Sequence, residues 1–100
     1  MIIYNVTLKV DTDISDAWME WMKATHMPAL MGTGLFIDCR LCRLLEQDEA
    51  DGLTFIAQYS CEEIGHYNRY IDEYAEGFRA ESFKLFGSKF IAFRTLMEIV

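Results

Sequence analysis

Basic residues are scarce in this chain. Nine lysines and arginines stand against sixteen aspartates and glutamates, so the formal net charge of the 100 residues is −7. A surplus of negative charge repels the phosphate backbone of nucleic acids and the surface of anionic bilayers. We therefore expect neither a nucleic acid nor a membrane as a partner.

Long apolar runs and a disulfide framework are also missing. No apolar run approaches the roughly 20 residues that a membrane-spanning helix needs, and no basic segment of the kind that opens a signal peptide precedes the first strand pattern. The three cysteines are an odd number, which is typical of a reducing compartment. Together these absences predict a cytoplasmic protein.

Several signatures of metal, cofactor and hydrolase chemistry are absent as well. Cys39 and Cys42 spell C-x-x-C, but they fall in a predicted strand, where residues three apart point to opposite faces. A zinc pair needs a turn, and a redox pair needs a helix N-terminus. No serine lies in a nucleophile elbow and no glycine-rich phosphate loop exists. We expect no metal and no cofactor.

What the chain does have is apolar content and regular periodicity. Hydrophobic residues make up 52% of the sequence, enough for a modest core, and no linker or repeat divides it. A single domain over residues 1–100 is expected. Alternation predicts strands at 2–10, 35–46, 53–60 and 90–100, with Asp51-Gly52 as a hairpin signal between the second and third.

Apolar residues at helical spacing follow the first strand. Asp13 is a plausible N-cap, because negative charge is favourable at the positive end of a helix, and Gly32 and Gly34 end the segment. Pro28 biases the preceding residue away from helical dihedrals. The helix therefore either stops near His26 or restarts with Pro28 in its first turn.

A second helix is expected between the third and fourth strands. Ser60 with Glu63 has the spacing of a capping box at its start, Gly77 can interrupt it, and Gly87 ends it. The element order is then βαββαβ. Right-handed crossovers give an α+β, ferredoxin-like domain: a four-stranded antiparallel sheet with two helices on one face.

The other face of this sheet needs a cover, because the last strand carries large apolar side chains on both sides. A second copy of the chain, packed sheet to sheet, would provide it in a homodimer. The residues expected to meet the helices are Tyr4, Val6, Leu8, Phe55, Ala57, Tyr59, Ile91, Phe93 and Met97. Those expected on the opposite face are Asn5, Thr7, Asp38, Arg40, Gln58, Arg94 and Glu98.

Five stretches carry a family resemblance: MIIYNVTLKVD, WMEWMKATHMPALMGTG, RLCRLL, TFIAQY and KFIAFRTLMEIV. Across essentially the whole chain they resemble domain-of-unknown-function family 4286. That family is similar to the dimeric α/β-barrel superfamily, whose members include cofactor-independent monooxygenases, small-molecule isomerases and haem proteins. The resemblance implies a ferredoxin-like protomer that pairs sheet to sheet. It implies no catalytic residues, because the superfamily has no universal motif to place on this sequence.

His26 is the candidate catalytic residue. It lies near the end of the first predicted helix, close to Trp18 and Trp21, where a cleft between helix and sheet can open. An imidazole that titrates near neutral pH suits proton transfer on a small apolar substrate. The alternative is structural, because a histidine near a helix C-terminus is favoured by the helix dipole and can hydrogen-bond to the backbone.

Aromatic side chains and one arginine complete the candidate ligand site. Its members are Trp18, Trp21, His26, Arg43, Tyr59, Tyr67 and Tyr70. Aromatic walls with tyrosine hydroxyls as donors suit a flat ligand, although the same spacing also arises from ordinary core packing.

Two functions follow. The first is a small homodimeric protein that binds a small apolar or aromatic molecule in a cleft between sheet and helices, or a purely structural dimer. The alternative is a cofactor-independent monooxygenase- or isomerase-like enzyme, with His26 as acid or base and Arg43 or Arg94 orienting an anionic group.

Overall fold

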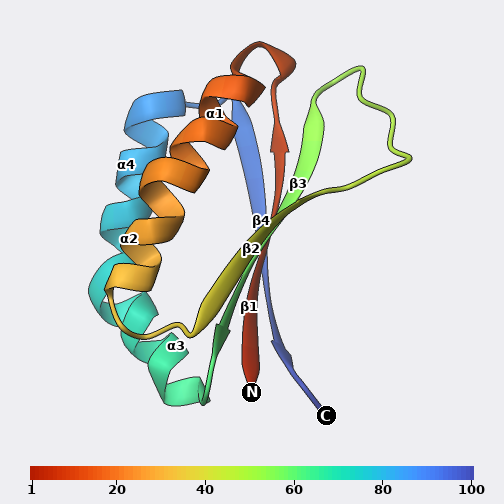
Figure 1. Cartoon of the computed structure of the whole chain (residues 1–100). Helices are drawn as coiled ribbons and strands as arrows, with labels where there is room; N and C mark the ends of the chain where they lie inside the picture. Colours follow the sequence, from red (N-terminus) through yellow and green to blue (C-terminus); the bar gives the residue numbers. More distant parts are fainter.

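The central strand of the sheet is β1 (Ile2–Val10), which pairs on one side with β3 (Leu53–Cys61) and on the other with β4 (Phe90–Glu98). β2 (Asp38–Arg43) lies outside β3, so the order is β2-β3-β1-β4 and every neighbouring pair is antiparallel. Figure 1 shows this sheet in the computed structural model, which describes residues 1–100. The predicted four-stranded antiparallel sheet is confirmed.

The second strand is shorter than the predicted segment 35–46. Leu35 and Phe36 precede it, and both are buried in the core. Residues 44–52 form the connection to β3. The connection ends at Gly52, where φ is 141° and an added Cβ would lie 2.6 Å from the carbonyl oxygen of Val10. Only glycine fits this close approach without strain.

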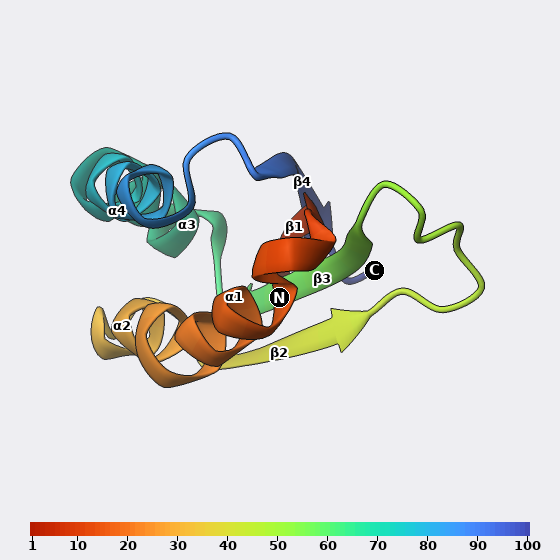
Figure 2. The same cartoon turned by 90° about the horizontal axis from the view of Figure 1, so that it is seen from above.

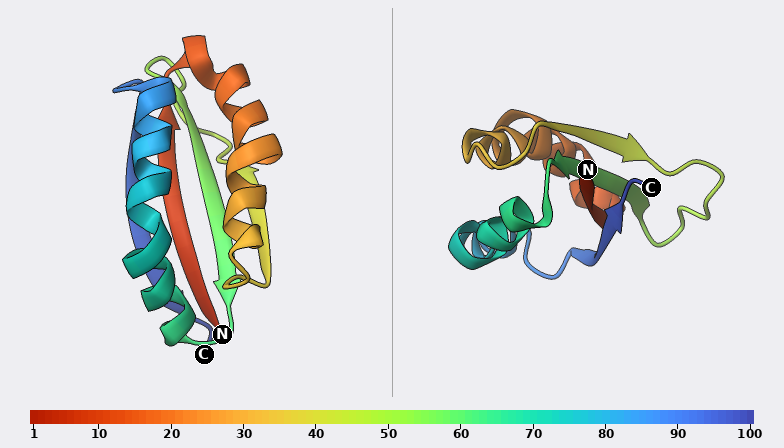
Figure 3. Two further views of the ribbon diagram at one scale, coloured as in Figure 1. Left: turned by 90° about the vertical axis from the view of Figure 1, so that its left-hand side faces the viewer. Right: turned by 90° about the horizontal axis from the view of Figure 1, so that it is seen from below.

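Two helical segments cover one face of the sheet (Figures 1 and 3). The first contains η1 (Thr12–Ile14), α1 (Ser15–Trp21), η2 (Met22–His26) and α2 (Met27–Gly32), and the second contains α3 (Ile64–Tyr70), η3 (Ile71–Ala75) and α4 (Glu76–Phe86). η1 is a 3₁₀ turn, whereas η2 and η3 are π-helical turns. None of these helices has the length and apolar character needed to cross a membrane.

Pro28 does not end the first helical segment. It lies in the first turn of α2, where its missing N–H does no harm. Met27, just before it, keeps helical dihedrals of φ −63° and ψ −43°, against the expected bias. The chain thus passes through the π-helical turn η2 directly into α2, which is the second of the two alternatives.

Neither predicted N-cap is observed. Asp13 lies inside η1, and its carboxylate forms an ion pair with Lys89. Ser60 belongs to β3, and α3 follows Glu63 without a side-chain cap. Both predictions were wrong because these side chains lie one element away from the helix ends that they were expected to cap.

The faces of β1 and β3 agree with the prediction, but those of β4 are reversed. Val6 pairs with Arg94 and Leu8 with Ala92, so the even-numbered residues of β4 share the helix-covered face. Arg94 and Glu98 were therefore wrongly placed on the open face. Three other residues of β4 were wrongly predicted to meet the helices. Ile91, Phe93 and Met97 lie on the open face, with exposed fractions of 60%, 67% and 41%.

Candidate functional site

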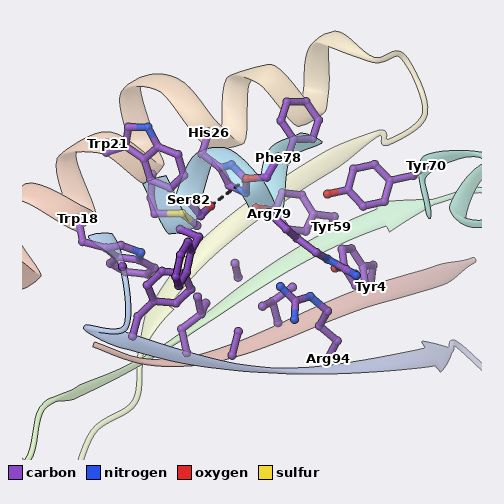
Figure 4. Close-up of a pocket in the computed structure, with 18 of the residues that line it drawn as sticks. Tyr4, Trp18, Trp21, His26, Tyr59, Tyr70, Phe78, Arg79, Ser82 and Arg94 are labelled. Carbon is purple, nitrogen blue, oxygen red and sulfur yellow. Dashed lines mark hydrogen bonds between the residues drawn. The ribbon is translucent and has the colours of Figure 1, made fainter. Parts of the chain in front are cut away.

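A cavity of about 370 Å³ lies between the sheet and the two helical segments. Strands β1, β3 and β4 form its floor, and side chains from α1, η2, α3 and α4 form its walls (Figure 4). Most of the lining residues are hydrophobic. The volume lies at the lower end of the range of about 300–1,000 Å³ that is usual for small-molecule sites.

Two alanines lie on the floor of the cavity, where their small side chains leave space. Ala57 pairs with Val6 across β1 and β3, and Ala92 pairs with Leu8 across β1 and β4. Above them, the two helical segments lie apart from one another on the same side of the sheet (Figure 2). Small floor residues beneath separated helices leave space that side chains do not fill.

One end of the cavity is apolar and aromatic. The buried Trp18 ring packs on Phe55 with a centroid distance of 4.9 Å. Trp21 stands beside it and meets Phe86 edge to face at 5.4 Å. Phe55 pairs with Leu8 on β1, so this end lies at the level of Leu8. Flat aromatic walls of this kind favour a flat apolar ligand.

The other end of the cavity carries hydroxyl and guanidinium groups. Arg79 donates a hydrogen bond of 3.5 Å to the Tyr4 hydroxyl. The rings of Tyr59 and Tyr70 lie 5.9 Å and 5.6 Å from that of Tyr4. Burial raises the pKa of Tyr59 and Tyr70, so both hydroxyls stay protonated at neutral pH and can donate. Arg94 also lines the cavity.

His26 lies between these two ends (Figure 4). Its ring stacks on Trp21 at 4.7 Å and meets Phe78 edge to face at 5.8 Å. Burial, and secondarily the positive charge of Arg94, lowers the pKa of His26 from 6.5 to about 4. The imidazole is therefore neutral at pH 7, and it forms no hydrogen bond with another protein group.

The structure brings most of the predicted site residues together. Those that line the cavity are Trp18, Trp21, His26, Tyr59 and Tyr70. Tyr67 is not among the lining residues, although its ring packs against Tyr4 at 5.3 Å. Arg43 lies away from the cavity, where its guanidinium binds the carboxylate of Glu49 at 2.6 Å.

Sequence reasoning missed the contribution of α4. Phe78, Arg79, Ser82 and Phe83 all line the cavity. The two adjacent pairs lie four residues apart, a spacing that places them near one face of a helix, and this is the signal that could have found them. Arg94 was assigned to the opposite sheet face, because the register of β4 was not known, although the enzyme alternative named it with Arg43 as a residue that orients an anionic group.

The cysteines lie as the strand pattern predicts. Cys39 pairs with Tyr59 and Cys42 with Ile56, so the two thiols occupy opposite faces of the sheet. Both are free, as is Cys61. No group of three or more histidine, cysteine, aspartate or glutamate side chains is placed to hold a metal ion.

The family model for the Domain of unknown function (DUF4286) matches residues 1–100. The chain belongs to this family. No curated protein gives a significant match. The DUF4286 chain is similar in structure to ferredoxin-like proteins at low sequence identity.

Three solved structures illustrate the likeness. HapK from Hahella chejuensis has a TM-score of 0.73 and 13% identity, with 100% of this chain and 93% of that chain covered. An ethyl tert-butyl ether d (ethd) family protein from Bacillus halodurans has a TM-score of 0.68 and 14% identity, with 100% of both chains covered. A dimeric ferredoxin-like protein from an uncultured marine organism has a TM-score of 0.66 and 13% identity, with 99% and 96% covered. At these identities the likeness shows the fold alone.

The partly buried imidazole of His26 predicts a pH-dependent stability. The pKa of His26 is lowered in the folded protein, so the unfolded chain takes up the proton first as the pH falls. This contribution is therefore present above about pH 6.5 and is lost as the pH falls towards about 4. We expect the free energy of unfolding to fall by about 2 kcal/mol between pH 7 and pH 5.

Urea unfolding at the two pH values measures this change. The variant His26→Gln should lose most of the difference, whereas His66→Gln, in the other helical segment, should keep it. Most carboxylates remain ionised over this range, which separates their titration from that of His26. Equal pH dependence in wild type and His26→Gln would contradict the assignment.

Proposed function

We propose that this protein is a homodimer that binds a small, flat aromatic molecule in the cavity between sheet and helices. The observation that carries the proposal is the cavity itself, with its aromatic walls and its few convergent polar groups. A site of this composition is the usual form of a small-molecule pocket. In a protein with a purely structural role, the same cavity would lower the free energy of unfolding and serve no purpose.

The cavity suits a ligand of one or two rings. Trp18 and Trp21 offer flat apolar surfaces at one end, and the neutral His26 can accept or donate a hydrogen bond part-way along. The hydroxyls of Tyr59 and Tyr70 supply donors near the other end. Together these groups would fix the orientation of a flat molecule rather than merely bury it.

The dimer is proposed from the open face of the sheet. Its large apolar side chains include Phe93 and Ile91, which are 67% and 60% exposed. A polar row crosses the centre of this face: Gln58 donates to Asn5 at 3.1 Å, and Asn5 donates to Thr95 at 3.2 Å. The row already forms hydrogen bonds within itself, which lowers the cost of covering it with a partner. A second copy would cover the apolar positions, as the dimeric ferredoxin-like neighbour suggests.

A charge on the open face should prevent dimer formation. We expect Phe93→Glu to be monomeric where the wild type is dimeric, because the contact would bury an unpaired carboxylate. Leu85→Glu, at a position on α4 that is 53% exposed, is the matched control and should remain dimeric. Native mass spectrometry reads both states. A dimeric Phe93→Glu protein, or a monomeric wild type, would contradict the sheet-to-sheet dimer.

Filling the cavity should weaken binding. We expect calorimetry to detect binding of at least one of two probes of the same shape, neutral 2-naphthamide and anionic 2-naphthoate. Ala92→Phe places a ring on the cavity floor and should weaken that binding at least about tenfold. Ala80→Phe, at an exposed position of α4 outside the lining, should bind as the wild type does. If neither probe binds to the wild type, the proposal fails.

The second candidate is a cofactor-independent enzyme in which His26 acts as acid or base. The observation that favours it is the free imidazole in the cavity wall, neutral and without a protein partner. A pKa of about 4 makes His26 a weak base, so a bound substrate would have to stabilise the imidazolium for proton transfer to be fast.

Mass spectrometry of co-purified molecules tests this candidate. If this candidate is right, untagged His26→Asn protein should carry a molecule that differs from that carried by the wild type in mass or, for an isomer, in chromatographic retention time, because an unconverted substrate would accumulate in the variant. His66→Asn is the control and should carry the same molecule as the wild type. The same molecule in wild type and His26→Asn would leave binding as the function.

A further inference from the structure

Two arginines from distant parts of the chain lie at the same end of the cavity. Arg79 belongs to α4 and Arg94 to β4, and both line the cavity. Arg79 donates to the Tyr4 hydroxyl, and Arg94 pairs with Val6, two residues from Tyr4 on the same face of β1. Both positive charges also act on the Tyr70 hydroxyl. In Figure 4 their guanidinium groups lie near one another beside Tyr4.

Neither guanidinium has an acidic partner. The three ion pairs of the protein join Arg43 to Glu49, Arg69 to Glu73, and Lys89 to Asp13. The lining of the cavity contains no aspartate and no glutamate. This is unusual placement in a chain where acidic residues outnumber basic ones by sixteen to nine. Two like charges at one site repel each other, and an anion placed between them would relieve that repulsion.

We infer that the cavity takes a flat aromatic molecule that carries a carboxylate, with the carboxylate bound by Arg79 and Arg94. This inference rests on the proposed function, because it assigns the ligand class of the same cavity. Guanidinium groups match a carboxylate with two parallel N–H donors each, and such charge-assisted bonds are stronger than neutral ones. Protonated Tyr59 and Tyr70 hydroxyls lie on the same side as further donors.

The two ends of the cavity set the size of this ligand. Tyr4 marks the arginine end and Leu8 the tryptophan end of the same face of β1. The four intervening steps of the strand span about 13 Å. A fused two-ring system with one carboxylate is shorter than this span, so it fits with its rings beside Trp18 and Trp21 and its charge towards Arg79 and Arg94. His26, neutral and stacked on Trp21, lies beside the rings rather than the charge.

The charge of the ligand is tested with two probes that differ in little else. Calorimetry compares 2-naphthoate with 2-naphthamide, which has the same rings and nearly the same shape but no charge. We expect the wild type to bind the carboxylate at least about tenfold more tightly than the amide. Raising the salt concentration should reduce this preference, because the two arginines are solvent-accessible at the cavity mouth.

Variants assign the preference to the two arginines. Arg79→Gln and Arg94→Gln should each reduce it, and the double variant should remove it, because the carboxylate loses more affinity than the amide when a guanidinium is removed. Arg94→Lys keeps the positive charge and should retain part of the preference. Arg69→Gln, which removes a positive charge from the outer surface of α3, is the matched control and should bind both probes as the wild type does.

The outcomes separate this inference from the proposed function. Equal binding of the two probes, abolished in both cases by Ala92→Phe, would overturn the carboxylate assignment while the proposed function stands. A carboxylate preference that survives the double arginine variant would also overturn it, because another group would then bind the charge. If neither probe binds to the wild type, the proposed function and this inference fail together.

Discussion

The pairing of β1 with a strand on each side is the constraint on which the rest of the structure depends. Nine consecutive residues of β1 pair with β3 and the same nine pair with β4. Once this register is set, Tyr4, Val6 and Leu8 become the centre of the cavity floor. It also decides which residues of the neighbouring strands join them, among them Ala57, Ala92 and Arg94. The helices then need only cover this face, and their imperfect coverage leaves the cavity.

Periodicity predicted the parts of the fold in which one side of an element is clearly more apolar than the other. In β1, the alternation of Tyr4, Val6 and Leu8 with polar neighbours was sufficient to assign its faces. In β4 both faces are apolar, so alternation does not show which face meets the helices. Only the pairing of Val6 with Arg94 assigns the two faces. The aromatic part of the site was predictable from helical spacing, whereas Arg79 enters it through a contact with Tyr4 75 residues away along the chain.

At neutral pH the only charged side chains that line the cavity are two arginines. Burial keeps Tyr59 and Tyr70 protonated and His26 neutral at pH 7. The remaining charges, on Arg79 and Arg94, lie on one end of an otherwise aromatic space. This local positive field opposes the net charge of the whole chain, −7, so the field at the cavity and the field far from the protein have opposite signs. Specificity and long-range attraction are therefore set by different residues.

The alternation within β4 has an evolutionary consequence. Phe93, Arg94 and Thr95 are consecutive, and they face the open side, the cavity and the open side in turn. Insertion or deletion of one residue in the turn after Gly87 would shift the strand by one position and exchange the two sets of side chains. A single such event would bring Phe93 into the cavity and expose Arg94 on the opposite surface. A relative with such a shift would keep only the charge of Arg79 in its cavity, without any substitution in the strand.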